Sequence, residues 1–185
     1  MKRVVLALFL FPAALAAQAT QVSTPHHHGS GQIDIVFSET GFSLALRVPS
    51  MDIVGFESPV ENDDNRTRVA IAMSELSDPL DLFVTPPEAG CSTVTAHVVL
   101  TYGTTRQSGE ANAVTGSTTA ESHSEFQADY VIQCQDMNAL NMIEFAYFAR
   151  FSGTGQLKLH LNTGGVQDAV EITRAAPYLD LPPDR

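Results

Sequence analysis

The fold is set by residues 32–48, which read QIDIVFSETGFSLALRV. Apolar and polar residues alternate on both sides of a Gly-bearing turn at 38–41. Side chains of a strand point alternately to its two faces, so each run has one apolar face. Two such runs around a short turn predict a β-hairpin with one buried face, and Pro49 ends the second strand. The predicted inward residues are Ile33, Ile35, Phe37, Phe42, Leu44, Leu46 and Val48.

A second, longer hairpin is predicted between Cys91 and Cys134. The strand after Cys91 and the strand from about Ser124 each have an alternating apolar face, and 103–122 is rich in small and polar residues. We expect an exposed, mobile loop at the tip of this hairpin and the two cysteines close together at its base, where they can form a disulfide. The predicted inward residues are Val94, Ala96, Val98, Leu100, Tyr102, Phe126, Ala128, Tyr130 and Ile132.

The rest of the pattern predicts one helix and three further strands. Capping and acidic residues at 61–64 precede apolar residues at helical spacing, which continue through about Ser77. Strands are expected at about 140–145, 156–162 and 166–173, and 146–151 fits either a strand or a helical turn. The predicted fold is α+β: a mainly antiparallel β-sheet with one principal helix of about four turns packed on a face, in a single domain at 32–182.

The N-terminus has the pattern of a secretory signal peptide at residues 1–16. Lys2 and Arg3 precede an apolar run of about a dozen residues, and Ala14-Leu15-Ala16 supplies a cleavage site, with 17–19 as a second candidate. The alternative, a membrane anchor, needs about 20 apolar residues. We therefore predict export to the periplasm, with no membrane span in the mature chain and a flexible, His-bearing segment at 17–31.

Charge and cysteine content narrow the function further. The chain has 10 basic and 21 acidic residues, and loss of the two basic residues in the signal peptide takes the net charge from −11 to −13. Such a charge opposes binding to nucleic acid. Both cysteines would reach an oxidising compartment, and neither lies in a Cys-x-x-Cys motif, so a disulfide is favoured over a catalytic thiol.

The sequence favours metal binding over catalysis. No nucleophile elbow, phosphate-binding loop, His-Glu-x-x-His or dinucleotide motif is present, so we predict that the protein is not an enzyme. Imidazole and carboxylate groups are zinc ligands. His26 and His28 would project to one side of an extended chain, while His97 and His123, with Glu125, are expected on the polar faces of neighbouring strands.

Two plainer interpretations of these histidines stay open. Each outward histidine, including His160 on a later strand, could be a solvated side chain with no ligand. The run HHHGS at 26–30 is also typical of an expression tag and linker, but it follows a natural-looking signal peptide and has only three histidines. We interpret it as a natural segment.

Several of these residues together resemble the ZrgA-type family of exported, zinc-regulated bacterial proteins. The matches are His26-His27-His28-Gly29 before a strand, Val54-Gly55-Phe56-Glu57 with Pro59, Cys91, and the spaced set His123, Phe126, Tyr130 and Cys134. The resemblance covers the chain from about residue 26 to its end. It implies a periplasmic protein that binds zinc and assists zinc uptake beside a zinc transporter or other envelope protein.

Carried over by position, the resemblance implies His26, His28 and His123 as zinc ligands and a disulfide between Cys91 and Cys134. This chain departs from the family pattern in two places. Residues 103–122 contain no histidine where relatives carry a His- and acid-rich loop, and Ser58 stands where relatives tend to have histidine. The resemblance therefore implies one or two sites rather than high-capacity binding. The alternative is an exported interaction domain without a physiological metal.

Overall fold

The computed structural model describes residues 28–104, 122–163 and 166–182. The predicted signal peptide, His26 and most of the predicted loop at 103–122 lie outside these ranges. The described chain begins at His28. Of His26 and His28, which were predicted to bind one ion together, only His28 can therefore be placed.

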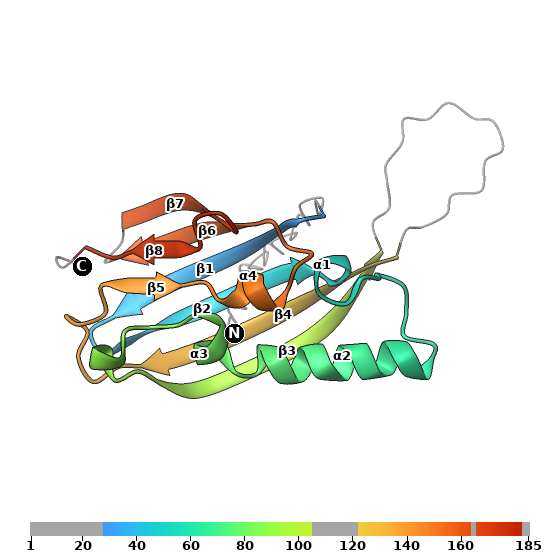
Figure 1. The fold of residues 1–185 in the computed structure, drawn as a ribbon, viewed down its shortest axis with the longest axis horizontal. Coiled ribbons are helices and arrows are strands. Elements are labelled where there is room, and N and C mark those ends of the chain that lie inside the picture. The colour runs from blue at the N-terminus through green and yellow to red at the C-terminus, as the bar shows by residue number, and fades with distance from the viewer. Residues whose placement is uncertain (1–27, 105–121, 164–165, 183–185) are drawn as a thin grey trace, which may run out of the picture.

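Six strands form one sheet in the order β3-β4-β2-β1-β6-β7 (Figure 1). Both predicted hairpins are confirmed, with β1 antiparallel to β2 and β3 antiparallel to β4. A second, two-stranded sheet pairs β5 with β8. The strand bounds are β1 Ser30–Ser38, β2 Gly41–Pro49, β3 Ser92–Thr104, β4 Ser122–Gln133, β5 Met142–Glu144, β6 Gln156–Thr163, β7 Val166–Thr173 and β8 Tyr178–Asp180.

The sheet is mixed, because β1 and β6 pair in parallel along Ser30–Val36 and Gln156–Asn162. The predicted sheet was mainly antiparallel, and four of its five strand pairings are so. An apolar face looks the same in a parallel and an antiparallel strand, so the alternation could not give the direction of β6. The chain between β4 and β6 crosses to the other end of the sheet, through β5 and α4, and this crossing sets the direction.

The helices of the described chain lie on one face of the six-stranded sheet (Figure 1). The longest, α2, begins after Asn62, whose side chain accepts the Asn65 N–H at 2.8 Å, and has Asp63 and Asp64 in its first turn. None of the described helices is long and apolar enough to cross a membrane. The helix bounds are α1 Ser50–Val54, α2 Asp63–Leu76, α3 Pro79–Leu82, the 3-10 turn Pro87–Ala89, and α4 Tyr147–Arg150.

The core fills the space between the sheet and this helical layer. The inward residues of β1, β2 and β4 are almost completely buried, as the alternation predicted, except Phe37, which is partly buried. Tyr130 links the two layers directly, since its hydroxyl donates to the Leu76 carbonyl at 2.7 Å. Phe83 stacks on Tyr147 and meets Phe145 edge to face, which gives the core an aromatic centre.

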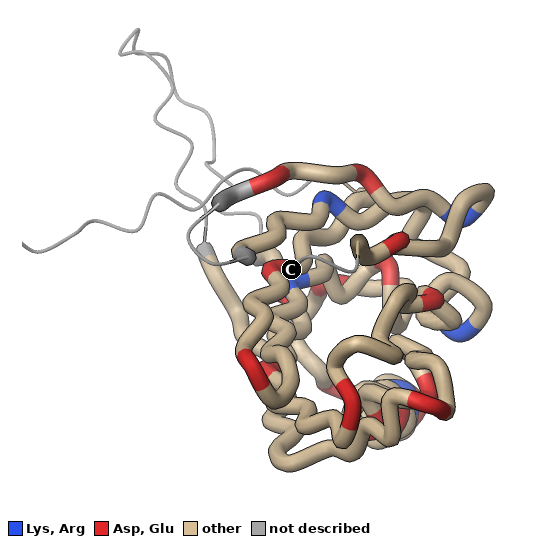
Figure 2. Tube along the Cα trace, turned by 90° about the vertical axis from the view of Figure 1, so that its left-hand side faces the viewer, with Lys and Arg blue, Asp and Glu red and all other residues tan. Residues whose placement is uncertain are grey.

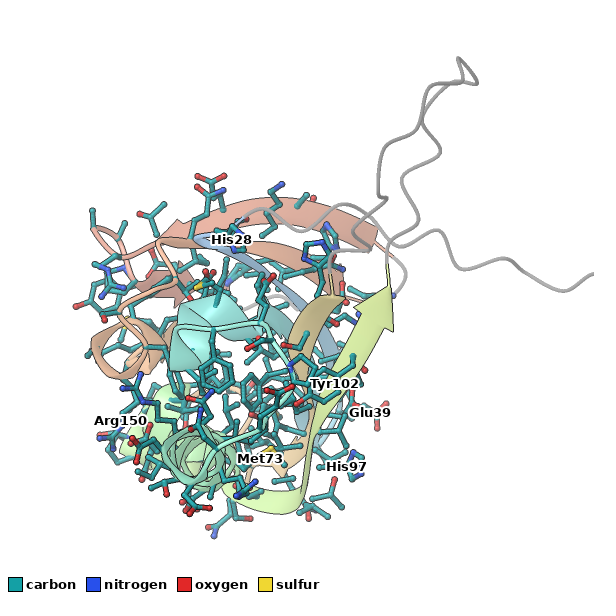
Figure 3. The ribbon with its side chains drawn as sticks, turned by 90° about the vertical axis from the view of Figure 1, so that its right-hand side faces the viewer. His28, Glu39, Met73, His97, Tyr102 and Arg150 are labelled. Atoms are coloured by element: carbon teal, nitrogen blue, oxygen red, sulfur yellow. A yellow bond between two sulfur atoms is a disulfide. The ribbon has the colours of Figure 1, made fainter. Side chains whose placement is uncertain are left out.

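The prediction for β3 was largely wrong: Val94 and Tyr102 are 56% and 49% exposed, Ala96 is exposed as well, and only Val98 and Leu100 are partly buried against the core. The register of β3 against β4 shifts between Thr93 and Thr95, so Val94 is an unpaired extra residue and leaves the core face. β3 is also an edge strand, with a neighbour on one side only. Tyr102 lies near its end, where Figure 3 shows it at the surface.

Cys91 and Cys134 form the predicted disulfide, with their Cα atoms 3.9 Å apart. Each cysteine flanks the pair Ser92 and Gln133 that closes the β3–β4 ladder, so the bridge lies at the base of the hairpin. The hairpin register alone therefore brings the two sulfur atoms together.

We expect protein purified from an oxidising compartment to contain no free thiol. Replacing both cysteines by alanine should lower the free energy of unfolding by about 4 kcal/mol, because a loop of this length is no longer closed in the unfolded chain. Denaturant unfolding of the two proteins measures the difference, and thiol titration tests the bridge. Two reactive sulfhydryls in the native protein would contradict the assignment.

Candidate metal site

The site lies where β2 ends and α1 begins. β2 stops at Pro49, which pairs with Glu125, whereas β4 starts three residues earlier at Ser122. The first residues of β4 therefore extend past the end of β2, and the segment after α1 lies beside them. This junction brings together parts of the chain that are far apart in sequence.

The Glu57 carboxylate lies between two imidazoles. Its Oε2 is 3.0 Å from Nδ1 of His123, and its Oε1 is 3.6 Å from Nδ1 of His28. The Glu57 side chain is mostly covered, with 11% of it exposed, against 27% for His123 and 58% for His28. Within the described chain, Oε1 is a buried acceptor that receives no hydrogen bond. Such an unsatisfied anionic oxygen is unusual in a folded protein.

Two buried serines hold the backbone that carries Glu57. Ser50 Oγ donates to the Phe56 carbonyl at 2.6 Å, and Ser124 Oγ donates to the Glu57 carbonyl at 3.0 Å. The two hydroxyls also contact each other, and both residues are at most 3% exposed. Gly55, with φ of +82°, makes the left-handed turn that returns the chain toward β4 after α1. The position of Glu57 is thus fixed from α1 and from β4.

The backbone next to His28 is held equally firmly. The Gly29 N–H lies 2.9 Å from both carboxylate oxygens of Asp52, and the Gly29 carbonyl accepts the N–H groups of Gly155 and Gln156 at 2.8 and 3.1 Å. Asp52 is 5% exposed and lies in α1. The chain therefore enters the fold already bound on both sides, and β1 begins at Ser30, inside the segment predicted to be flexible.

Burial raises the pKa of the Asp52 carboxyl, and the nearby negative charge of Glu57 adds to the increase. The Gly29 N–H and the neighbouring His28 imidazole act in the opposite direction. Two acidic side chains, Asp52 and Glu57, thus lie close to two imidazoles at this end of the sheet. Elsewhere, acidic positions are spread along the chain (Figure 2).

The donor set suits a divalent ion. Two imidazole nitrogens and one carboxylate are a combination found in zinc sites. However, no three such side chains of the described residues are already arranged around one point as a metal-binding group. Both Nδ1 atoms face the carboxylate, so an ion would have to enter between them, with adjustment of the more exposed His28 ring.

The structure brings together two of the residues predicted from sequence, His28 and His123. It does not bring His97 to them, because His97 pairs with Asp129, six residues along β4 from His123 and about 20 Å away at strand spacing. His28 and His97 lie well apart in Figure 3. Glu125 is two residues beyond His123 on the same face of β4, where its side chain accepts from Gln127 at 2.8 Å.

The remaining sequence candidates lie elsewhere or outside the described ranges. His160 is bound to Asp34 at 2.9 Å on the outer face of the sheet. His26 is outside the described ranges. Asp52 and Glu57 were not predicted as site residues. Glu57 is part of the Gly-Phe-Glu motif and could have been predicted as a site residue from it. No sequence pattern around Asp52 marks that residue.

The stability of the protein relative to an Asp52→Asn variant should depend on pH. A carboxyl whose pKa is raised in the folded state binds more protons there than in the unfolded chain. Its contribution to stability is therefore full below its ordinary pKa of 3.8 and is lost as pH rises through the folded value. Urea unfolding of both proteins between pH 4 and pH 7 measures this. As pH rises, we expect the free energy of unfolding of the wild type to fall relative to that of the variant. A constant difference, or a change in the opposite direction, would contradict the role of burial.

A comparison with protein families gives a match over the part of the chain that contains these residues. A family model described as "ZrgA family zinc uptake protein" matches residues 25–181, which include His28, Glu57 and His123. No curated protein matches the chain. Because the family match spans most of the chain, the protein belongs to the ZrgA family of zinc uptake proteins.

Proposed function

We propose that this protein binds zinc between His28, Glu57 and His123, and that it assists zinc uptake as a non-enzymatic periplasmic protein. The observation that carries the proposal is the buried Glu57 carboxylate, shared by two imidazoles and with one oxygen that accepts no hydrogen bond from the described residues. The family match supports the link to zinc uptake.

A buried carboxylate needs a positive partner. Taking an ionised group out of water costs several kcal/mol unless a counter-charge or strong hydrogen bonds compensate. Among the described residues, the ionisable groups that face Glu57 are the imidazoles of His28 and His123. A zinc ion between the three side chains would supply the missing charge and would satisfy Oε1.

Three protein ligands leave one tetrahedral position open. A catalytic or transfer site keeps such a position for water or for an incoming ligand, whereas a structural zinc site is closed by four protein ligands. His26, two residues before His28 in the sequence, is our candidate for the fourth position; it lies outside the described residues. A single site of this kind agrees with the absence of histidine from 103–122.

The periplasmic location rests on the signal peptide predicted at 1–16. The Cys91–Cys134 disulfide agrees with an oxidising compartment. In that compartment the natural partner is a zinc transporter or one of its envelope components. The acidic chain would draw cations toward it without binding nucleic acid.

Calorimetric titration of the mature protein with zinc at pH 7.5 tests the site. We expect a dissociation constant below about 100 μM, which corresponds to more than about 5 kcal/mol of binding free energy. His28→Ala, Glu57→Gln and His123→Ala should each weaken binding at least about tenfold, because each removes one of three ligands. His160→Ala is the matched control, since it also removes an imidazole bound to a carboxylate, and it should bind zinc as the wild type does.

A wild type with no binding in this range, or three variants that bind as tightly as the wild type, would overturn the zinc proposal. The protein would then be an exported interaction domain without a physiological metal. If His97→Ala or Glu125→Gln weakened binding and His28→Ala did not, the site would lie on the outer face of β3 and β4 instead.

Zinc binding should also weaken in acid. Imidazole must be neutral to coordinate a metal, and it ordinarily titrates near pH 6.5. With two imidazole ligands, lowering the pH from 7.5 to 5.5 should weaken binding by about a hundredfold. The His123→Ala variant, with one imidazole fewer, should show a smaller pH effect. Equal pH dependence in both proteins would show that His123 is not a ligand.

A further inference from the structure

We infer that Asp52 is a positioning residue for this site: it binds the backbone beside His28 and so sets the zinc affinity without touching the ion. The inference rests on the proposed zinc site, and it adds a determinant of affinity that neither the family match nor the sequence pattern contains. Its basis is the geometry around Gly29.

Gly29 is bound from two directions. Asp52 accepts its N–H with both carboxylate oxygens at 2.9 Å, and the chain at Gly155 and Gln156 donates to its carbonyl. Because the peptide N–H of Gly29 belongs to the same planar unit as the His28 carbonyl and Cα atom, fixing this unit also fixes the position of the Cα atom that carries the His28 side chain. Without Asp52 nothing on the N–H side of this unit, within the described chain, would hold it.

Asp52 is itself fixed by close packing. A Cβ atom placed on Gly153 would lie 2.3 Å from the Asp52 carbonyl oxygen, so α1 sits directly on the backbone of the chain before β6. The same stretch supplies Gly155, which binds the Gly29 carbonyl. The acceptor and donor that clamp Gly29 therefore belong to one packed unit.

The short helix α1 also controls the other side of the site. Ser50, two residues before Asp52, binds the carbonyl of Phe56 and contacts Ser124, which binds the carbonyl of Glu57. One five-residue helix thus holds the backbone at both His28 and Glu57. Supporting groups of this kind, one step away from the ligands, commonly set the affinity of a metal site.

A charged side chain at position 52 suits a residue that positions His28 better than it suits a residue that only stabilises the fold. Burial raises the pKa of its carboxyl, so the ionised form lowers the stability of the fold. A charged acceptor, however, makes a shorter and stronger hydrogen bond to a backbone N–H than a neutral amide does. The ionised carboxylate therefore makes a stronger hydrogen bond to the Gly29 N–H, but it lowers the stability of the fold.

A double-mutant cycle on the mature protein, with zinc affinity measured by chelator competition at pH 7.5, tests the inference. We expect Asp52→Asn to weaken binding about tenfold and Asp52→Ala more strongly, in the range typical of such supporting groups. In a His28→Ala background the same Asp52 changes should have less than about a twofold effect, because the ligand they position is already gone. In a His123→Ala background their effect should persist.

Two further measurements separate positioning from general damage. In the metal-free protein, amide hydrogen exchange at Gly29 should become faster in Asp52→Ala, whereas that at Ile33, in the centre of the sheet, should not change. Asp34→Asn is the matched control, because Asp34 also accepts from a neighbouring chain segment but lies on the outer face, and it should leave zinc affinity unchanged.

Equal losses from Asp52→Asn in the wild-type and His28→Ala backgrounds would overturn the inference, as would unchanged zinc affinity in both Asp52 variants. Failure of the zinc site itself has a different signature. In that case His28→Ala, Glu57→Gln and His123→Ala would all bind as the wild type does, and the inference would fall with the site even if exchange at Gly29 showed the contact to be real.

Discussion

The end of β2 is the constraint from which the site follows. Pro49 cannot continue the ladder, so the chain turns into α1 while β4 extends past it. Beyond Pro49, β4 at Ser124 is paired with β3 alone, and the returning segment is held there by the Ser124 hydroxyl, which donates to the Glu57 carbonyl. The carboxylate that follows is carried into a position where little water reaches it. Its burial then requires partners, and the two nearest are imidazoles.

The two imidazoles are held in unequal ways. His123 pairs with Gly103 in the β3–β4 ladder, so its backbone is part of the sheet even though β2 has already ended there. His28 precedes β1 and depends on contacts made by Gly29. The exposed fractions of the two side chains, 27% for His123 and 58% for His28, follow the same order. A bound ion would therefore have one ligand from rigid structure and one from the chain terminus, with the buried carboxylate between them.

The sequence predicted those parts of the fold that local patterning controls. The alternation at 32–48 and at 124–134 predicted the strands, their buried faces and the disulfide, because each depends on residues close in sequence or on a hairpin register. The parallel pairing of β1 with β6 depends on a crossing of the whole chain, which no local pattern encodes. For the site, His28 and His123 were predicted as residue types, but their meeting through Glu57 required the turn after α1. Asp52 could not be found, since a five-residue helix after Pro49 has no distinguishing sequence pattern.

Asp52 differs from an ordinary core residue, because its charge would affect the stability of the fold and the proposed zinc affinity in opposite directions. A domain could close this junction with an uncharged side chain, as it does at Ser50 and Ser124, and avoid the cost of an ionised carboxylate that is 5% exposed. Retaining the charge is reasonable if the strength of the hydrogen bond to Gly29 matters for something besides folding. The group that gains from it is the His28 side chain, one residue away and 3.6 Å from Glu57. If zinc binds as proposed, the same bond that shapes the start of β1 would also determine how well the three-ligand site forms.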